Sequence, residues 1–313
     1  MKPSPDITEL AAPPLVADRS TAPAVGTLKS RVVDFYELTK PRMNFLVVIT
    51  TMVGYYMAGR DKHDWPLMVA ALIGTALTAA GASVLNQYVE RDLDKNMPRT
   101  RNRPLPGGRI EPLEALAYGV TLGVSGVALL WFRVNPLTAA LGAITLLTYL
   151  VVYTPLKRVS SLNTVVGAIP GAIPPMMGWT AATGVLSVEA IALFAILFIW
   201  QMPHFLAIAI LYKNDYAAGG FKMLPNEDDE NLSITSRQIV LYNLAMIPVS
   251  IVPSMVGMAG SAYFTAAVLL SVAYLSFGIS VAASRARLDA RKLFFASIIY
   301  LPLLLAAMMI DRL

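Results

Sequence analysis

Long apolar runs alternate with short polar stretches along most of the chain. A transmembrane helix needs about 20 mostly apolar residues, and nine of these runs meet or approach that length. The predicted spans cover residues 43–59, 66–88, 113–132, 136–153, 163–182, 188–211, 238–258, 262–283 and 292–310. Pro and Gly interrupt several of them, which membrane helices tolerate when neighbouring helices satisfy the freed backbone groups. The pattern predicts an all-α, polytopic membrane protein with nine transmembrane helices.

Two segments precede the first span. Residues 1–28 are rich in Pro and Ala and have no apolar core of a cleavable signal peptide, so we expect a disordered tail. Residues 29–42, KSRVVDFYELTKPR, mix charged side chains with Val, Phe, Tyr and Leu and predict a short interfacial helix. The rest of the chain, 29–313, is expected to form one membrane domain.

Composition agrees with a membrane protein. Hydrophobic residues make up 56% of the chain and charged residues only 14%, against about 25% in soluble domains. The chain has no cysteine, which excludes disulfides and thiolate metal sites. Its pI of about 9.3 is explained by basic loops beside a membrane, and we expect no nucleic-acid partner.

The basic residues are distributed unevenly between the loops. Of the 25 Lys and Arg residues, all but Arg60, Lys62, Arg133 and Arg312 fall on one side of the nine-span arrangement. By the positive-inside rule, the N-terminus is predicted to be cytoplasmic and the C-terminus to face outward.

The stretch NQYVERDLDKNMPRTRNRPLP, residues 86–106, places charges directly after an apolar span. Asn86, Glu90 and Asp94 are spaced i, i+4, i+8, so they share one helix face if the span continues through them. Their oxygen atoms suit Mg²⁺, which combines a few carboxylates with phosphate oxygens and water. Arginines that follow could hold the phosphate itself: Arg99, Arg101, Arg103 and Arg109. The alternative is a solvated loop whose acids pair with its arginines.

This stretch resembles the first aspartate-rich motif, N-x-x-x-[D/E]-x-x-x-D, of the UbiA-type intramembrane prenyltransferases. Further stretches resemble the heme O synthases, a branch of that superfamily. They are LTKPR at 38–42, YTPLKR with SLNTVVGAIPGAIPP at 153–175, and WQMPHF with DYAAGGFKMLP at 200–225. The superfamily fold has nine transmembrane helices, in agreement with the span pattern.

The resemblance implies transfer of a farnesyl group from farnesyl diphosphate to a vinyl group of protoheme IX (heme b), with addition of water, giving heme O. Asn86, Glu90, Asp94 and Asp215 would hold Mg²⁺, and further cations would complete the diphosphate site: Lys157, Arg158 and Lys213. The second acidic motif, D-x-x-x-D-x-x-x-G, is matched only by Asp215 and Gly219, because Leu211 occupies its first position. The number of Mg²⁺ ions is therefore left open.

His204 lies within a predicted span, where an ionisable side chain is a candidate for function. Imidazole is a common heme ligand, and Trp200 nearby could flank a porphyrin. The alternative is a buried His that hydrogen-bonds between helices. The three prolines of the 163–182 span either break that helix or only kink it.

Three other functions fit parts of the pattern. A related prenyltransferase could use a quinone precursor or another aromatic ring, a secondary transporter could have broken helices, and a structural subunit of a respiratory complex could be equally apolar. The acids cluster at span ends rather than at mid-membrane, which favours the enzyme. The resemblance implies a bacterial inner membrane, a cytoplasmic active site, and partners among heme A synthase or oxidase assembly factors.

Overall fold

The computed structural model describes residues 28–59 and 64–313, and its regular elements there are all helices. The predicted disordered tail falls almost wholly on residues 1–27, outside the described residues. The helices are α1 (Leu28–Leu38), α2 (Pro41–Ala58), α3 (Trp65–Asp94), α4 (Pro112–Arg133), α5 (Pro136–Leu147), the π-helix η1 (Thr148–Tyr153), α6 (Thr154–Leu156), α7 (Asn163–Thr183), α8 (Val188–Leu211), α9 (Lys213–Ala218), α10 (Leu224–Glu227), α11 (Ser233–Met255), α12 (Ser261–Ser284) and α13 (Arg287–Ile310).

Each predicted span corresponds to helical structure, although α2 ends at Ala58 and α11 at Met255, slightly before the predicted ends, and α1 covers most of the predicted interfacial helix. Among the described residues, 7 segments are long and apolar enough to cross a membrane: Trp65–Asp94, Pro112–Arg133, Pro136–Leu156, Val188–Leu211, Ser233–Met255, Ser261–Ser284 and Arg287–Ile310. The chain is thus a multi-pass membrane protein. α2 is only 18 residues long, so any 18-residue stretch of it includes Arg42 and Asn44, and α7 is rich in Gly, Pro and Thr. The count of nine spans and the orientation stay predictions.

Local sequence explains where the long helices begin. The first turns of α2, α3, α4 and α5 contain proline, whose missing N–H costs nothing there. The Asp64 carboxylate accepts a hydrogen bond from the Leu67 N–H at 3.0 Å, and the Asn135 side chain accepts one from the Thr138 N–H at 2.8 Å. These caps satisfy donors that a helix cannot pair internally.

Small residues allow α3 and α4 to pack closely. A Cβ added at Gly81 on α3 would lie 2.5 Å from the backbone nitrogen of Gly123 on α4, and one added at Gly126 would lie 2.5 Å from the nitrogen of Thr78. Helices in lipid associate through such contacts because apolar burial gives them no advantage over lipid. This pair therefore fixes the position of the helix that carries Asn86, Glu90 and Asp94.

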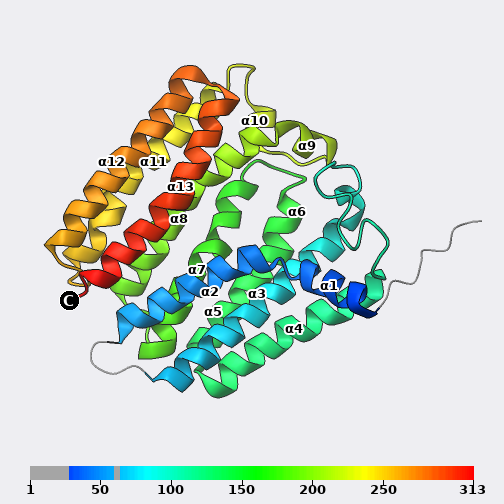
Figure 1. Ribbon diagram of the computed structural model, residues 1–313, viewed down its shortest axis with the longest axis horizontal. Helices are drawn as coiled ribbons and strands as arrows, with labels where there is room; N and C mark the ends of the chain where they lie inside the picture. Colours follow the sequence, from blue (N-terminus) through cyan, green and yellow to red (C-terminus); the bar gives the residue numbers. More distant parts are fainter. Residues whose placement is uncertain (1–27, 60–63) are drawn as a thin grey trace, which may run out of the picture.

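The helices form two groups, shown in Figure 1. Helices α8, α11, α12 and α13 pack together on one side, while α2, α3, α4, α5 and α7 pack on the other. The C-terminal end of α3, α6, α9 and α10 lie toward the end of the molecule opposite the C-terminus. Both predicted acidic motifs therefore lie at the same end.

The predicted 136–153 span is not one regular α-helix. After α5, the chain continues as the π-helix Thr148–Tyr153 and the short α6. The Thr154 N–H donates to the Tyr149 carbonyl, five residues back, and Pro155 has no N–H to donate. By contrast, α7 continues through Pro170, Pro174 and Pro175, so these prolines do not break it.

Candidate functional site

The site is built on the last turns of α3. This helix continues through Asp94, as the spacing predicted, and Asn86, Glu90 and Asp94 are only 1%, 5% and 1% exposed. Three buried oxygen-bearing side chains on one helix face require polar partners, since leaving them unpaired costs several kcal/mol. Neighbouring segments supply those partners.

Each of the three side chains contacts a different basic residue. The Lys40 ammonium donates to Asn86 Oδ1 at 3.1 Å, and the Lys157 ammonium lies 2.7 Å from Glu90 Oε1. The Arg103 guanidinium lies 2.8 Å from Asp94 Oδ2. The three acceptors lie on α3. Their basic partners come from the α1–α2 junction, the end of α6 and the loop after α3.

Lys157 is held from several directions. Its ammonium lies 4.5 Å from the centroid of the Tyr153 ring and 5.7 Å from that of Phe221. Its carbonyl accepts a hydrogen bond from the Lys222 N–H at 2.7 Å. Burial lowers the pKa of Lys157, but the Glu90 carboxylate together with Tyr149 and Tyr216 outweighs this effect, and the net pKa is raised. Lys157 therefore stays protonated throughout the neutral range.

Lys40 is a site residue that the spacing of the acidic motif did not reveal. It has the left-handed backbone φ of 49°, uncommon for a non-glycine residue, immediately before Pro41 begins α2. Desolvation, reinforced by the charges of Arg103 and Lys157, lowers the pKa of Lys40 to about 7. The side chain can therefore gain or lose a proton near neutral pH.

The π-helix adds aromatic and hydroxyl groups to the site. The Tyr149 hydroxyl lies 3.5 Å from Asn86 Oδ1, and the Asn86 amide donates to Thr154 Oγ1 at 3.1 Å. Such local irregularities often occur at functional sites. Sequence analysis missed Tyr149 and Thr154, although YTPLKR was recognised as a motif.

Asp215 lies on α9, which the structure brings to the end of α3. A Cβ added at Gly219, just after α9, would meet Met97 Sδ at 2.8 Å. The Arg99 guanidinium lies 5.0 Å from the Tyr212 ring centroid and 5.6 Å from that of Tyr216. Asp215 itself is half-buried. Both acidic segments thus border one region.

The other predicted cations are placed differently. Arg101 and Arg158 are exposed near the site, and Lys213 is half-buried on α9. Arg109 instead pairs with α1, at 2.8 Å from Asp34 Oδ1 and 3.4 Å from Glu37 Oε2. It anchors the loop after α3 to the interfacial helix.

The acidic run 227–230 extends from the end of α10 toward α11, and its residues are exposed except for the half-buried Asp228. Asp228 accepts from the Thr235 N–H at 2.6 Å, and Asp229 accepts from the Ser233 N–H at 2.9 Å. These bonds cap α11 and hold the pKa values of both carboxyls below their usual range. Asp228 and Asp229 therefore have a structural role.

His204 and Trp200 lie between α8 and α13. The His204 ring stacks on Trp200 at 5.2 Å and on Phe294 at 5.1 Å between centroids. His204 Nδ1 lies 2.7 Å from Ser297 Oγ, and the Trp200 indole N–H donates to the Ser297 carbonyl at 2.9 Å. His204 is half-buried, whereas Trp200 is 5% exposed. The second ring nitrogen of His204 could contact a ligand. The Trp200 ring, by contrast, is packed among neighbouring side chains and is almost fully buried.

The donor set of the acidic face fits Mg²⁺. Asn86, Glu90 and Asp94 offer hard oxygen atoms, the type this ion prefers. Within residues 28–59 and 64–313, no three His, Asp or Glu side chains approach closely enough to form a metal cage. A bound ion would need further oxygens from water or substrate, as is usual for Mg²⁺.

A sequence model of the UbiA prenyltransferase family matches residues 47–299. The chain belongs to that family. It is 46% identical to "Protoheme IX farnesyltransferase" of Solibacter usitatus, covering 89% of this chain and 98% of the relative. It is 44% identical to the protein of the same name from Myxococcus xanthus, covering 89% and 94%.

Solved structures with the UbiA fold agree with the helical arrangement. A structure of digeranylgeranylglyceryl phosphate synthase superposes with a TM-score of 0.77 at 15% identity, covering 90% of this chain and 98% of the other. A UbiA homologue from Archaeoglobus fulgidus, solved with DMAPP and Mg²⁺, gives a TM-score of 0.64 at 14% identity, covering 88% and 99%. At these identities the likeness shows the fold alone. Family membership, however, makes the chain a prenyltransferase and excludes the transporter.

Proposed function

We propose that this chain transfers a farnesyl group from farnesyl diphosphate to a vinyl group of protoheme IX, with addition of water, to give heme O. The similarity along nearly the full length of relatives named protoheme IX farnesyltransferase carries this proposal. In the reaction, the bond between the farnesyl C1 and the diphosphate oxygen breaks. A bond forms from C1 to the vinyl group, water supplies a hydroxyl, and its remaining proton is released.

Asn86, Glu90, Asp94 and Asp215 are the proposed Mg²⁺ ligands. The ion, when bound, would supply positive charge to the leaving diphosphate. The three α3 residues are buried side by side, and α9 brings Asp215 to the same end of α3. The arrangement supports oxygen ligation, while the number of ions is left open.

The basic residues of the site hold the diphosphate in this proposal. Lys157 and Arg103 are already ordered through Glu90 and Asp94. A phosphate group could take over these contacts while a metal ion took the carboxylates. Such preorganised charge lowers the barrier because little reorganisation is needed during reaction. Further proposed diphosphate contacts are Arg99, Arg101, Arg158 and Lys213, and we add Lys40 because its ammonium lies beside Asn86.

His204 is the proposed heme contact, with Trp200 supporting its ring. Trp200 is packed between helices, so its role is positioning through the stacked rings rather than a broad face for the porphyrin. Protoheme's vinyl group is itself the nucleophile and needs no base to begin. The chain's task is to bring that group to farnesyl C1 and keep water away until the new bond has formed.

The test is an assay of membranes that contain this protein. They are incubated with protoheme, farnesyl diphosphate and Mg²⁺, and the extracted hemes are analysed by mass spectrometry. A hydroxylated farnesyl heme is expected, and its absence with folded protein present would refute the proposal. We propose a bacterial inner membrane and a cytoplasmic active site, and oxidase assembly as the destination of the product.

A further inference from the structure

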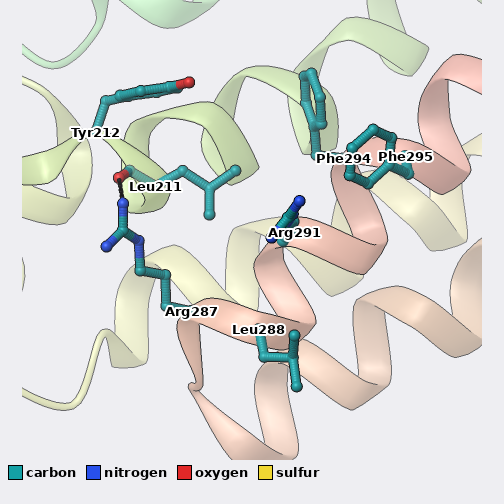
Figure 2. A pocket seen from close by; sticks show the side chains of 7 residues that line it. All are labelled: Leu211, Tyr212, Arg287, Leu288, Arg291, Phe294 and Phe295. Carbon is teal, nitrogen blue, oxygen red and sulfur yellow. Dashed lines mark hydrogen bonds between the residues drawn. The ribbon is translucent and has the colours of Figure 1, made fainter.

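A pocket of about 600 Å³ lies between the end of α8 and the first turns of α13. Figure 2 shows Tyr212 and Leu211 on the α8 side and Arg287 and Arg291 on the α13 side. Its volume is within the range of small-molecule sites, about 300–1,000 Å³. None of the residues proposed to bind metal or diphosphate lines it.

The pocket carries uncompensated positive charge. Its lining contains two arginines and no carboxylate. The nearby acid on the same helix, Asp289, is engaged by Lys292 at 2.8 Å and by Ser284 at 2.5 Å. Arg287 donates to the Leu211 carbonyl at 3.1 Å, and the Arg291 guanidinium lies 5.7 Å from the Phe295 ring centroid. Both guanidinium groups therefore keep donors for an anionic ligand.

The pocket changes from charged to apolar along α13. Arg287 and Arg291 are four residues apart, so their Cβ atoms lie about 6 Å apart on one helix face. Phe294 follows Arg291 by three residues, about 4.5 Å further along the helix axis. This order suits a ligand with two anionic groups on one edge of a large apolar body.

Two contacts connect the pocket to the site described above. Tyr212, which lines it, also lies under the Arg99 guanidinium of the loop after α3. Phe294, which lines it as well, stacks on His204. Leu211 occupies the position where the superfamily motif has its first aspartate, so the wall there is apolar rather than acidic.

We infer that this pocket binds the carboxylate edge of the acceptor, with Arg287 and Arg291 pairing with the two propionate groups of a porphyrin. The inference rests on the proposed function, because it takes protoheme as acceptor. Guanidinium–carboxylate pairs would fix the orientation of the ring, and the ring's apolar part would extend over Phe294 toward His204.

The test compares protoheme with its dimethyl ester, which lacks both negative charges. Arg291→Gln is the main variant. Arg287 is less suitable because its guanidinium also donates to the Leu211 carbonyl at the end of α8. Arg285→Gln, an exposed change between α12 and α13 that leaves the pocket lining intact, is the matched control. Steady-state kinetics of farnesyl transfer are measured for both acceptors in nanodiscs of neutral lipid and of lipid with added anionic phosphatidylglycerol, together with Kd for farnesyl diphosphate.

Arg291→Gln is expected to raise KM for protoheme about 10-fold, equal to about 1.4 kcal/mol, and to leave Kd for farnesyl diphosphate unchanged. With the dimethyl ester, wild type, Arg291→Gln and Arg285→Gln should have equal KM values. The inference is overturned if Arg291→Gln prefers protoheme over the ester as strongly as wild type does. It is also overturned if the defect occurs only with anionic lipid, which would assign the arginine to lipid headgroups. Inactivity of the wild type on both acceptors would instead refute the proposed function.

Discussion

The Lys157 ammonium lies 2.7 Å from the Glu90 carboxylate, with the two side chains only 13% and 7% exposed. The pair joins the end of α6 to the buried face of α3, and so joins the motif YTPLKR to NQYVERDLD. In the proposed reaction the partners would separate, since Lys157 would pair with the diphosphate and Glu90 would help to hold the metal ion, which would supply positive charge to the leaving group. The pair therefore stabilises the free protein and prepares both groups for substrate.

Removing one partner of this pair should destabilise the protein. Lys157→Met leaves Glu90 buried and unpaired, which costs about 3–5 kcal/mol in comparable pairs. Thermal unfolding in detergent should show a lower Tm, and farnesyl transfer should be lost. The double variant Lys157→Met/Glu90→Gln should recover much of the Tm but none of the activity. Recovery of activity along with Tm would show that the pair is only structural.

Asp94→Ala should abolish farnesyl transfer, because Asp94 is a proposed metal ligand and the partner of Arg103. Asp92→Ala is the matched control, since Asp92 lies in the same turn but is 68% exposed and pairs with Lys95. It should retain wild-type turnover, and EDTA should reproduce the Asp94 defect in the wild type. Near-normal turnover of Asp94→Ala at saturating Mg²⁺ would show that Asp94 is not a metal ligand.

Diphosphate binding should depend on pH through Lys40. The pKa of Lys40 is lowered to about 7 in the free protein, and a bound anion would raise it. Binding then takes up a proton, so affinity should be greatest below pH 7 and should fall as pH rises, by at most about tenfold per unit. In Lys40→Arg the side chain stays charged, so this part of the pH dependence should vanish. Both proteins are measured by titration calorimetry from pH 6 to 9. Because the ligand is the same, the difference between the two profiles excludes the contribution of the ligand's own ionisation. Identical profiles would contradict the role of Lys40.

His204→Ala should reduce the heme retained by the purified protein and shift its Soret band, while farnesyl diphosphate binding persists. His204→Met should restore part of the heme if the role is ligation, because a thioether also binds heme iron. Ser297→Ala is the control, since it removes the hydrogen bond to Nδ1 but keeps the imidazole. An unshifted Soret band in both His204 variants would show that His204 packs between helices and does not bind heme.

The sequence predicted the helices well because each leaves a local signal. Residues 188–211 were predicted as a span, and α8 has the same bounds, since a mostly apolar run ends there at Tyr212 and Lys213. Asn86, Glu90 and Asp94 were predicted to share a face because helical periodicity depends only on neighbours in sequence. Arg42 and the many small residues of α7 explain why two predicted spans have a weaker apolar signature.

Other features depend on contacts between distant segments. The π-helix before Pro155 shifts the register and turns Tyr149 toward Asn86. Lys40 approaches Asn86 because its backbone is left-handed, a conformation that the Lys–Pro sequence does not predict. Arg109 looked like a phosphate ligand because it follows three other arginines, yet Asp34 on α1 holds it.

The most direct measurement of the central claim is a competition between acceptors. Purified protein in nanodiscs receives farnesyl diphosphate and Mg²⁺ with equal amounts of protoheme and a quinone-precursor benzoate, and both product classes are quantified by mass spectrometry. We predict hydroxylated farnesyl heme as the product, formed by the wild type and Asp92→Ala but not by Asp94→Ala. Prenylation of the benzoate with protoheme left unchanged would contradict the account and assign the chain to a different acceptor within the UbiA family.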